Sequence, residues 1–133
     1  MSARRVLTYG IFDRLSPSDA AFLRDAARLG GALIVGCATD RYCAEAGVRP
    51  ALPYDRRRAQ LLACRFVDRV IPMDSEAQTR TDIVNCDVDT LAMGADSAGL
   101  YDDLADVAAV RYLPRALPTP TAYATPRIVA VAV

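Results

Sequence analysis

The chain has 133 residues, of which 53% are hydrophobic and 24% are charged, and its formal net charge at pH 7 is zero. This composition is typical of a single globular domain and excludes a disordered chain. No stretch approaches the roughly 20 apolar residues of a membrane-spanning helix, and no apolar leader follows Met1, so we expect a cytoplasmic protein. Charges of both signs are interspersed, and we interpret the arginine run at 56–58 as a solvated helix face, so nucleic acid is not an expected partner.

Two absences limit the available chemistry. The chain contains no histidine, and all 16 of its basic residues are arginine. A Schiff-base lysine, a phosphate-binding lysine and an imidazole general base are therefore excluded. The four cysteines include no Cys-x-x-Cys pair, so we expect no metal site and interpret them as reduced, mostly buried thiols: Cys37, Cys43, Cys64 and Cys86.

The spacing of apolar residues predicts strands and helices that alternate along the chain. Strands are predicted at 5–9, 32–38, 67–71, 90–93 and 109–113. Helices are predicted at 17–29, 54–64, 75–85 and near 100–105, with an irregular stretch before residue 54 that contains Gly47, Pro50 and Pro53. This alternation indicates a Rossmann-like, doubly wound parallel sheet of five strands with helices on both faces.

The composition changes abruptly after Pro114. Prolines among threonines and alanines predict an extended segment, and the last six residues form a β-prone apolar run. We therefore expect one α/β domain at 1–115 and an extended tail at 116–133. The tail either adds an edge strand, docks on a partner or frays.

Two loops are the first places to look for a ligand, because open parallel sheets bind ligands beyond the carboxyl ends of their strands. The first predicted strand leads through Gly10 to Asp13, just before a helix whose free N–H groups and dipole favour a phosphate. The predicted strand at 90–93 leads to Gly94 and Asp96.

Short segments between about residues 5 and 115 stand in a distinctive order: LTYGIFD at 7–13, LIVG at 33–36, Thr39-Asp40, PYDRR at 53–57, Val67-Asp68, Met93-Gly94 and YLPR at 112–115. Their order and spacing resemble the glycerol-3-phosphate cytidylyltransferase family of nucleotidyltransferases. The resemblance implies a nucleotidyltransferase fold and a CTP site. It also implies a dimer and, for an active member, Mg²⁺.

The residues that handle the nucleotide in that family are replaced in this chain. Ile11 stands in the place of a threonine, and the lysine position falls near Ala46. The His-x-Gly-His segment is replaced by Ser16-Pro17-Ser18-Asp19, so Ser16 and Asp19 stand for the histidines and Ser18 for the glycine. Residues 119–122 replace the Ile-Ser-Thr-Thr segment, and Ser97 stands where a tryptophan is expected.

Other positions match the family and remain candidates for nucleotide binding: Tyr9, Gly10, Phe12, Asp13, Arg57, Gly94, Asp96 and Arg115. Arginines at two of these positions could pair with phosphates. The alternative interpretation is structural, with surface arginines, a helix-capping aspartate and turn glycines.

The replaced segment has the features of a helix start. Ser16 suits the N-cap, Pro17 the first helical position and Asp19 the third, which predicts a capping box with aspartate in place of glutamate. The alternative is a reworked catalytic loop, in which Asp13 or Asp19 holds Mg²⁺ against phosphates.

Three functions follow from these replacements. The first is a pseudoenzyme that pairs with itself or with an active relative. The second is a divergent transferase that converts CTP and a phosphorylated alcohol into a CDP-alcohol and pyrophosphate with arginines and Mg²⁺ instead of imidazoles. The third is a module that binds a nucleotide such as CTP without turnover.

Overall fold

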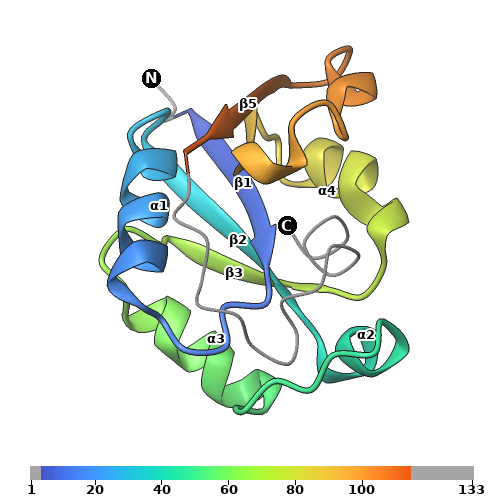
Figure 1. The fold of residues 1–133 in the computed structure, drawn as a ribbon. Helices are drawn as coiled ribbons and strands as arrows, with labels where there is room; N and C mark the ends of the chain where they lie inside the picture. Colours follow the sequence, from blue (N-terminus) through green and yellow to red (C-terminus); the bar gives the residue numbers. More distant parts are fainter. Residues whose placement is uncertain (1–3, 115–133) are drawn as a thin grey trace.

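A computed structural model of the chain describes residues 4–114 (Figure 1). The strands are β1 (Arg5–Gly10), β2 (Ala32–Ala38), β3 (Arg69–Met73), β4 (Thr90–Gly94) and β5 (Ala109–Leu113). The α-helices are α1 (Pro17–Ala27), α2 (Asp40–Glu45), α3 (Tyr54–Ala63) and α4 (Thr79–Asn85). Three 3₁₀ turns complete the described elements: η1 (Glu76–Gln78), η2 (Ala95–Ser97) and η3 (Asp102–Leu104).

The five strands form one parallel sheet in the order β3-β2-β1-β4-β5. Leu7 of β1 pairs with Ile34 of β2 on one side and with Leu91 of β4 on the other. The chain runs outward from β1 to β3 and then returns to the other side of β1, so the strand order reverses between β1 and β4. The predicted doubly wound sheet is confirmed.

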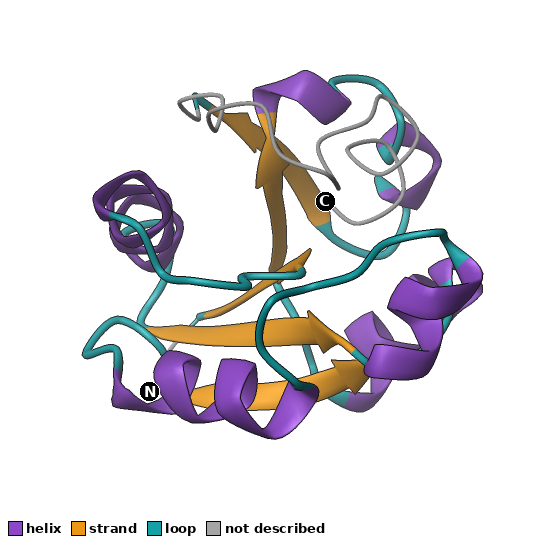
Figure 2. Cartoon of the chain, turned by 60° about the horizontal axis from the view of Figure 1, so that its bottom comes forward, coloured by secondary structure: helices purple, strands orange, loops and turns teal. Residues whose placement is uncertain are grey.

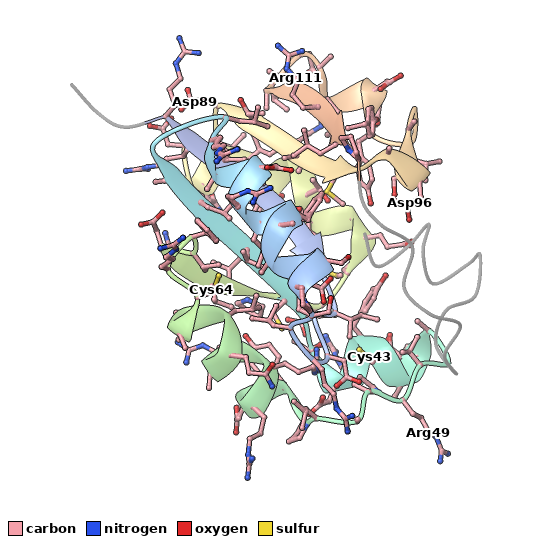
Figure 3. The ribbon with its side chains drawn as sticks, turned by 60° about the vertical axis from the view of Figure 1, so that its left-hand side comes forward. Cys43, Arg49, Cys64, Asp89, Asp96 and Arg111 are labelled. Carbon is pink, nitrogen blue, oxygen red and sulfur yellow. The ribbon has the colours of Figure 1, made fainter. Side chains whose placement is uncertain are left out.

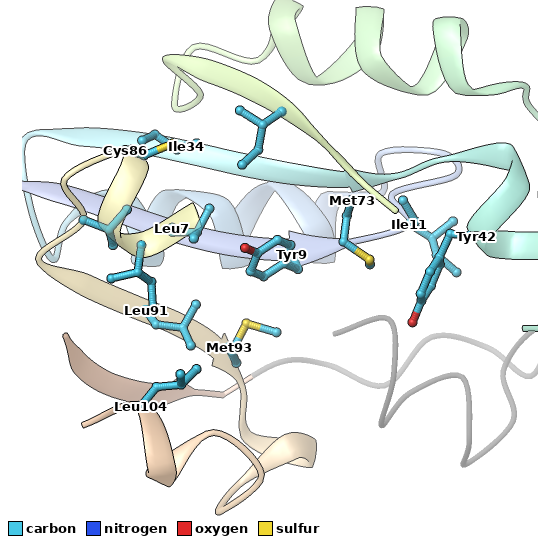
Figure 4. Close-up of a cluster of buried hydrophobic side chains, with 14 of the residues drawn as sticks. Leu7, Tyr9, Ile11, Ile34, Tyr42, Met73, Cys86, Leu91, Met93 and Leu104 are labelled. Carbon is cyan, nitrogen blue, oxygen red and sulfur yellow. The ribbon is translucent and has the colours of Figure 1, made fainter. Parts of the chain in front are cut away.

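Helices lie on both faces of the sheet (Figures 1 and 2), and one apolar cluster packs on each face. On one face, Phe22 and Leu23 of α1 and Leu61 of α3 pack in one cluster with the strands. On the other face, Ile83 of α4 and Tyr42 of α2 join a second cluster, part of which is drawn in Figure 4. The central strands are buried on both sides, which is why their sequences are continuous apolar runs.

The structure differs from the predicted elements in the region before and at β3. The stretch predicted as irregular contains the six-residue helix α2, which begins because the hydroxyl of Thr39 accepts a hydrogen bond from the Tyr42 N–H. The third strand begins at Arg69 instead of residue 67, because Asp68 uses its backbone N–H and its carboxylate to bond Leu33. Pro72 is tolerated in β3 because β3 is an edge strand.

Smaller differences lie at helix ends. The first helix ends at Ala27, two residues earlier than predicted, and the predicted helix at 75–85 is a 3₁₀ turn followed by α4. The predicted helix near 100–105 is only the turn η3. Within residues 4–114, the structure has no helix with the length and apolarity that crossing a membrane requires.

Candidate functional site

The site is expected where the strand order reverses, beyond the carboxyl ends of β1 and β4. We call the side of the sheet where the strands end its carboxyl edge. In Figure 3, Asp96, Cys43 and Arg49 lie toward this carboxyl edge, and Asp89 and Cys64 lie toward the opposite side, where the strands begin. The segments at the carboxyl edge follow β1, β2 and β4, and the residues singled out in the sequence lie in these segments, in the strand ends before them and in the helices after them.

The segment at 16–19 is a complete helix start. Ser16 is the N-cap of α1, and its hydroxyl accepts a hydrogen bond from the Asp19 N–H at 3.1 Å. The Asp19 carboxylate accepts in return from the Ser16 N–H at 3.2 Å. This reciprocal pair is the predicted capping box, with Pro17 at the first helical position. A carboxylate therefore stands at the helix N-terminus, where the dipole would otherwise favour a phosphate.

Ile11 lies in the hydrophobic core. Its side chain is buried and belongs to the same cluster as Tyr42, Val48 and Met73, and Figure 4 shows Ile11 beside Tyr42. The position implied to hold a threonine hydroxyl thus presents a methyl-rich side chain that packs against its neighbours. Ala46, at the position implied for a lysine, is the C-cap of α2 and packs against the same cluster. Neither residue offers a donor from its side chain.

The turn after β1 places Phe12 and Asp13 inside the protein. Phe12 has a φ of 48°, in the left-handed region that a non-glycine residue rarely adopts. Its ring lies on Gly10, where an added Cβ would come within 2.6 Å of it. Asp13 is buried and its carboxylate accepts hydrogen bonds from the N–H groups of Ala51 and Leu52 at 2.7 and 2.8 Å. This turn is therefore attached to the 50–53 loop through Asp13.

Arg57 is fully buried, so the interpretation of 56–58 as a solvated helix face is wrong at this residue. Its guanidinium donates hydrogen bonds to the carbonyls of Leu52, Ile11 and Ala38, at 3.0, 3.1 and 2.6 Å, and to the carboxylate of Asp40 at 2.8 Å. Ile11 follows β1, Ala38 ends β2, Asp40 begins α2, and Leu52 lies in the loop before α3. Arg57 thus joins the ends of β1 and β2 to the start of α2 and to the loop before α3, and its guanidinium points at protein atoms, not at an open phosphate site.

Asp40 is a residue of this region whose role the sequence did not indicate. Besides Arg57, its carboxylate accepts from the Tyr54 N–H at 3.0 and 3.1 Å. The Tyr54 N–H, and then the guanidinium of Arg57, hold the pKa of Asp40 below its ordinary value. Its position in the first turn of α2 is the one local signal, since acidic residues are favoured there.

Tyr9 also faces inward. It is buried, and its hydroxyl donates to the Asp82 carboxylate of α4 at 2.6 Å. Burial and the neighbouring Asp82 raise the pKa of Tyr9 above its ordinary range, so the phenol remains a donor. The ring covers Gly36 so closely that an added Cβ there would collide with it. Tyr9 thus joins β1 to α4.

The segment at the end of β4 carries the remaining candidates. Asp96 in η2 is exposed, whereas Gly94 is buried at the end of β4. Ser97 is fully buried, and its hydroxyl has no hydrogen-bond partner in the part of the chain that the structure describes. Arg115 lies outside the described residues.

The two acidic residues that the sequence offers for Mg²⁺, Asp13 and Asp19, are bonded to the backbone. Both oxygens of the Asp13 carboxylate are occupied by backbone N–H groups, and the Asp19 carboxylate bonds the backbone of Ser16. Among residues 4–114, no group of three or more acidic, cysteine or histidine side chains could hold a metal. Asp13 and Asp19 thus already accept backbone hydrogen bonds, so an Mg²⁺ held by either would have to share its carboxylate oxygens with these N–H groups.

The chain is similar in sequence and in fold to known proteins. The cytidylyltransferase-like family model matches residues 7–110. The glycerol-3-phosphate cytidylyltransferase of Bacillus subtilis is 36% identical over 112 residues, covering 84% of this chain and 87% of that protein. The enzyme of the same name from Staphylococcus aureus is 37% identical over 112 residues, covering 84% and 85%. The crystal structure of a lipopolysaccharide core biosynthesis protein from Thermoplasma volcanium superimposes with a TM-score of 0.72 and 25% identity, covering 85% of this chain and 98% of that one.

The fold and the carboxyl-edge loops define a nucleotidyltransferase-type Rossmann-like protein. The chain belongs to the cytidylyltransferase-like family, and glycerol-3-phosphate cytidylyltransferases are among its homologues.

Proposed function

We propose that this chain is a catalytically inactive member of the cytidylyltransferase-like family that acts by binding a nucleotide or a protein partner without transferring a nucleotidyl group. The observation that carries the proposal is the capping box of α1, in which Ser16 and Asp19 bond each other's backbone. These side chains serve the helix, at the position where the family resemblance implies two imidazoles.

A nucleotidyl transfer develops negative charge on the reacting phosphate. Attack on an α-phosphate concentrates negative charge on the phosphoryl oxygens, which fixed donors must stabilise. Removing one such donor typically lowers a rate by roughly 10²–10³. Here Ile11, Ser16 and Asp19 each replace a donor that the resemblance implies, although such losses are not additive.

Asp19 opposes the phosphate in a second way. Its carboxylate lies at the N-terminus of α1, where it would repel a triphosphate and compete for backbone N–H groups. Arg57 does not offset this charge, since its side chain is fully buried and bonded to three carbonyls and one carboxylate.

The alternative function is an active but divergent cytidylyltransferase. It is favoured by the identity of 36% to a Bacillus subtilis enzyme over most of both chains. In that case exposed arginines near the carboxyl edge, such as Arg14 and Arg41, would stabilise the phosphates in place of imidazoles. Mg²⁺ would then have to be held mainly by the substrate, as it often is in phosphoryl transfer.

Pyrophosphate release separates the two functions. The full chain is incubated with CTP, Mg²⁺ and glycerol 3-phosphate or a panel of other phosphorylated alcohols, with the Bacillus subtilis enzyme as the positive control. We expect release indistinguishable from the protein-free background. Turnover well above background with any acceptor overturns the proposal and establishes the alternative.

Binding without turnover is tested separately. A thermal shift with CTP that Arg115→Ala abolishes would identify a nucleotide-binding module. If no nucleotide shifts the melting temperature, the remaining role is pairing with a second copy or with an active relative. Sedimentation of the chain alone and mixed with that relative measures this role directly.

A further inference from the structure

A cleft of about 520 Å³ opens between the start of α4 and the segment that follows β4. It is lined by Glu76, Ala77, Thr79, Arg80, Leu100, Tyr101, Asp103 and Leu104. Its volume lies within the roughly 300–1,000 Å³ typical of small-molecule sites. The cleft is separate from the loops that Asp13 and Arg57 join, because none of its lining residues belongs to them.

The charge of the lining is negative. Glu76 and Asp103 are exposed and contribute two carboxylates. Arg80 is the one cation among the described residues that line the cleft, and its guanidinium is already paired. It donates to both oxygens of Asp106, at 2.8 and 3.2 Å, and to the backbone carbonyl of Asp103 at 3.2 Å. An incoming anion would therefore meet two carboxylates and an arginine that already has an acidic partner.

Leu100 and Tyr101 also line the cleft, and Tyr101 is partly buried against the core. Leu100 is 54% exposed, so its apolar side chain is accessible to a ligand in the cleft. Tyr101 is fixed by its backbone N–H, which donates to the hydroxyl of Tyr112 at 2.9 Å. Burial, and then the charge of Glu76, raises the pKa of Tyr101 to about 12, so its side chain is neutral at physiological pH and lies in a negative field.

We propose that this cleft binds an organic cation, with its ammonium group between Glu76 and Asp103 and its apolar body against Leu100 and the ring of Tyr101. Carboxylates attract an ammonium, and an aromatic ring adds a cation–π contact. A ligand that is only anionic, such as phosphate, lacks a partner here. The inference goes beyond the proposed function, because it involves neither a nucleotide nor the residues at the start of α1.

The probes are tetraethylammonium, which has a large apolar body, and putrescine, which has primary ammonium groups. Each is titrated into the full chain while the backbone amide signals of Leu100 and Tyr101 are followed by NMR and the affinity by calorimetry. We expect saturable shifts centred on these amides. Inorganic phosphate at the same ionic strength should leave them in place.

The decisive variant is the double substitution Glu76→Gln and Asp103→Asn. Neither side chain makes a hydrogen bond within the described residues, and both are exposed, so the fold is expected to persist. The matched control is Glu45→Gln with Asp55→Asn, which removes the same charge from α2 and α3. We expect the affinity to fall about tenfold or more in the first variant and to change by less than about twofold in the control, because surface charges distant from the cleft are screened by salt.

Tyr101→Leu separates the aromatic contribution, since it keeps an apolar side chain and removes the ring. It should weaken tetraethylammonium binding more than putrescine binding. Equal affinity in the Glu76→Gln and Asp103→Asn variant, shifts that map elsewhere, or no saturable binding of either probe below about 10 mM would each overturn the proposal. Each of those results leaves the proposed inactivity untouched, since that depends on Ser16 and Asp19.

Discussion

The start of α1 and the loops around Arg57 lie at the same edge of the sheet, yet they are built in opposite ways. Ser16 and Asp19 bond each other across three residues of sequence. Arg57 reaches backbone atoms 5, 19 and 46 residues away. The first region is a local structure that any helix could carry, whereas the second depends on the whole fold.

The two regions also differ in how far they match the family. The residues that join the strand-end loops, Asp13, Asp40 and Arg57, match the family segments quoted from the sequence. The residues implied to act on the nucleotide have been replaced by a helix cap and by the core residue Ile11. Under the proposed inactivity, the chain keeps the residues that join its strand ends and loops because these residues also hold the domain together.

The largest expected effect is the loss of Arg57. Arg57→Met keeps the apolar stem but leaves the buried carbonyls of Ile11 and Ala38 and the partly buried carbonyl of Leu52 without their donor, and Asp40 without its ion pair. We expect the free energy of unfolding to fall by about 3 kcal/mol or more, measured by urea denaturation.

Arg56→Met is the matched control, because Arg56 is exposed on the same helix. Its effect should stay within about 0.5 kcal/mol. Equal losses in the two variants would mean that the buried hydrogen bonds of Arg57 do not hold the loops.

A smaller loss is expected at Asp13. Asp13→Asn keeps the size of the side chain but replaces one acceptor oxygen with an NH₂ group that faces an N–H of Ala51 or Leu52. Hydrogen bonds to a charged group contribute about 1.5–3 kcal/mol, so we expect a loss in that range by urea denaturation.

Asp55→Asn, at an exposed residue, is the comparison for this change of charge. In the NMR spectrum of Asp13→Asn, the amides of Ala51 and Leu52 should move most. A variant as stable as the wild type would show that the 50–53 loop is held by other contacts.

The same contrast explains what the sequence could predict. The alternation of strands and helices and the cap at Ser16 depend on neighbouring residues, so their patterns are visible in one chain. The environment of Arg57 is not visible in this way, because its carbonyl partners are backbone atoms far away in the sequence and have no sequence signal. An arginine between two other arginines therefore resembled a solvated residue although it is fully buried.

Short elements were predicted less well for a related reason. The helix α2 has only six residues, too few for a helical period to stand out before Gly47. Its N-cap, Thr39, was present in the sequence and could have indicated the helix start. The offset of β3 follows from pairing between Asp68 and Leu33, which are 35 residues apart.

At the start of α1 the expected losses are modest. Ser16→Ala and Asp19→Ala should each lower the free energy of unfolding by about 0.5–2 kcal/mol, since each removes one half of the capping box. Because the two side chains act as a pair, the double variant should lose less than the sum of the single changes.

The same variants test the proposed inactivity. Asp19→Ala removes a carboxylate from the helix N-terminus, so any affinity for CTP should stay unchanged or rise. If the chain instead releases pyrophosphate and Asp19→Ala abolishes that release, Asp19 serves the reaction and the helix-cap interpretation is incomplete.

The smallest effect is a dependence of stability on pH that comes from Asp40. The Tyr54 N–H and the Arg57 guanidinium lower the folded-state pKa of this carboxyl below its ordinary value near 3.8. Its contribution is therefore complete above about pH 4 and is lost as the pH falls through the folded-state pKa. The side chain is 57% exposed, so solvent screening limits the contribution to less than about 1 kcal/mol. Urea denaturation of the wild type and of Asp40→Asn should show a stability gap at pH 7 that narrows below pH 4. An unchanged gap at pH 2 would mean that Asp40 acts by shape and not by charge.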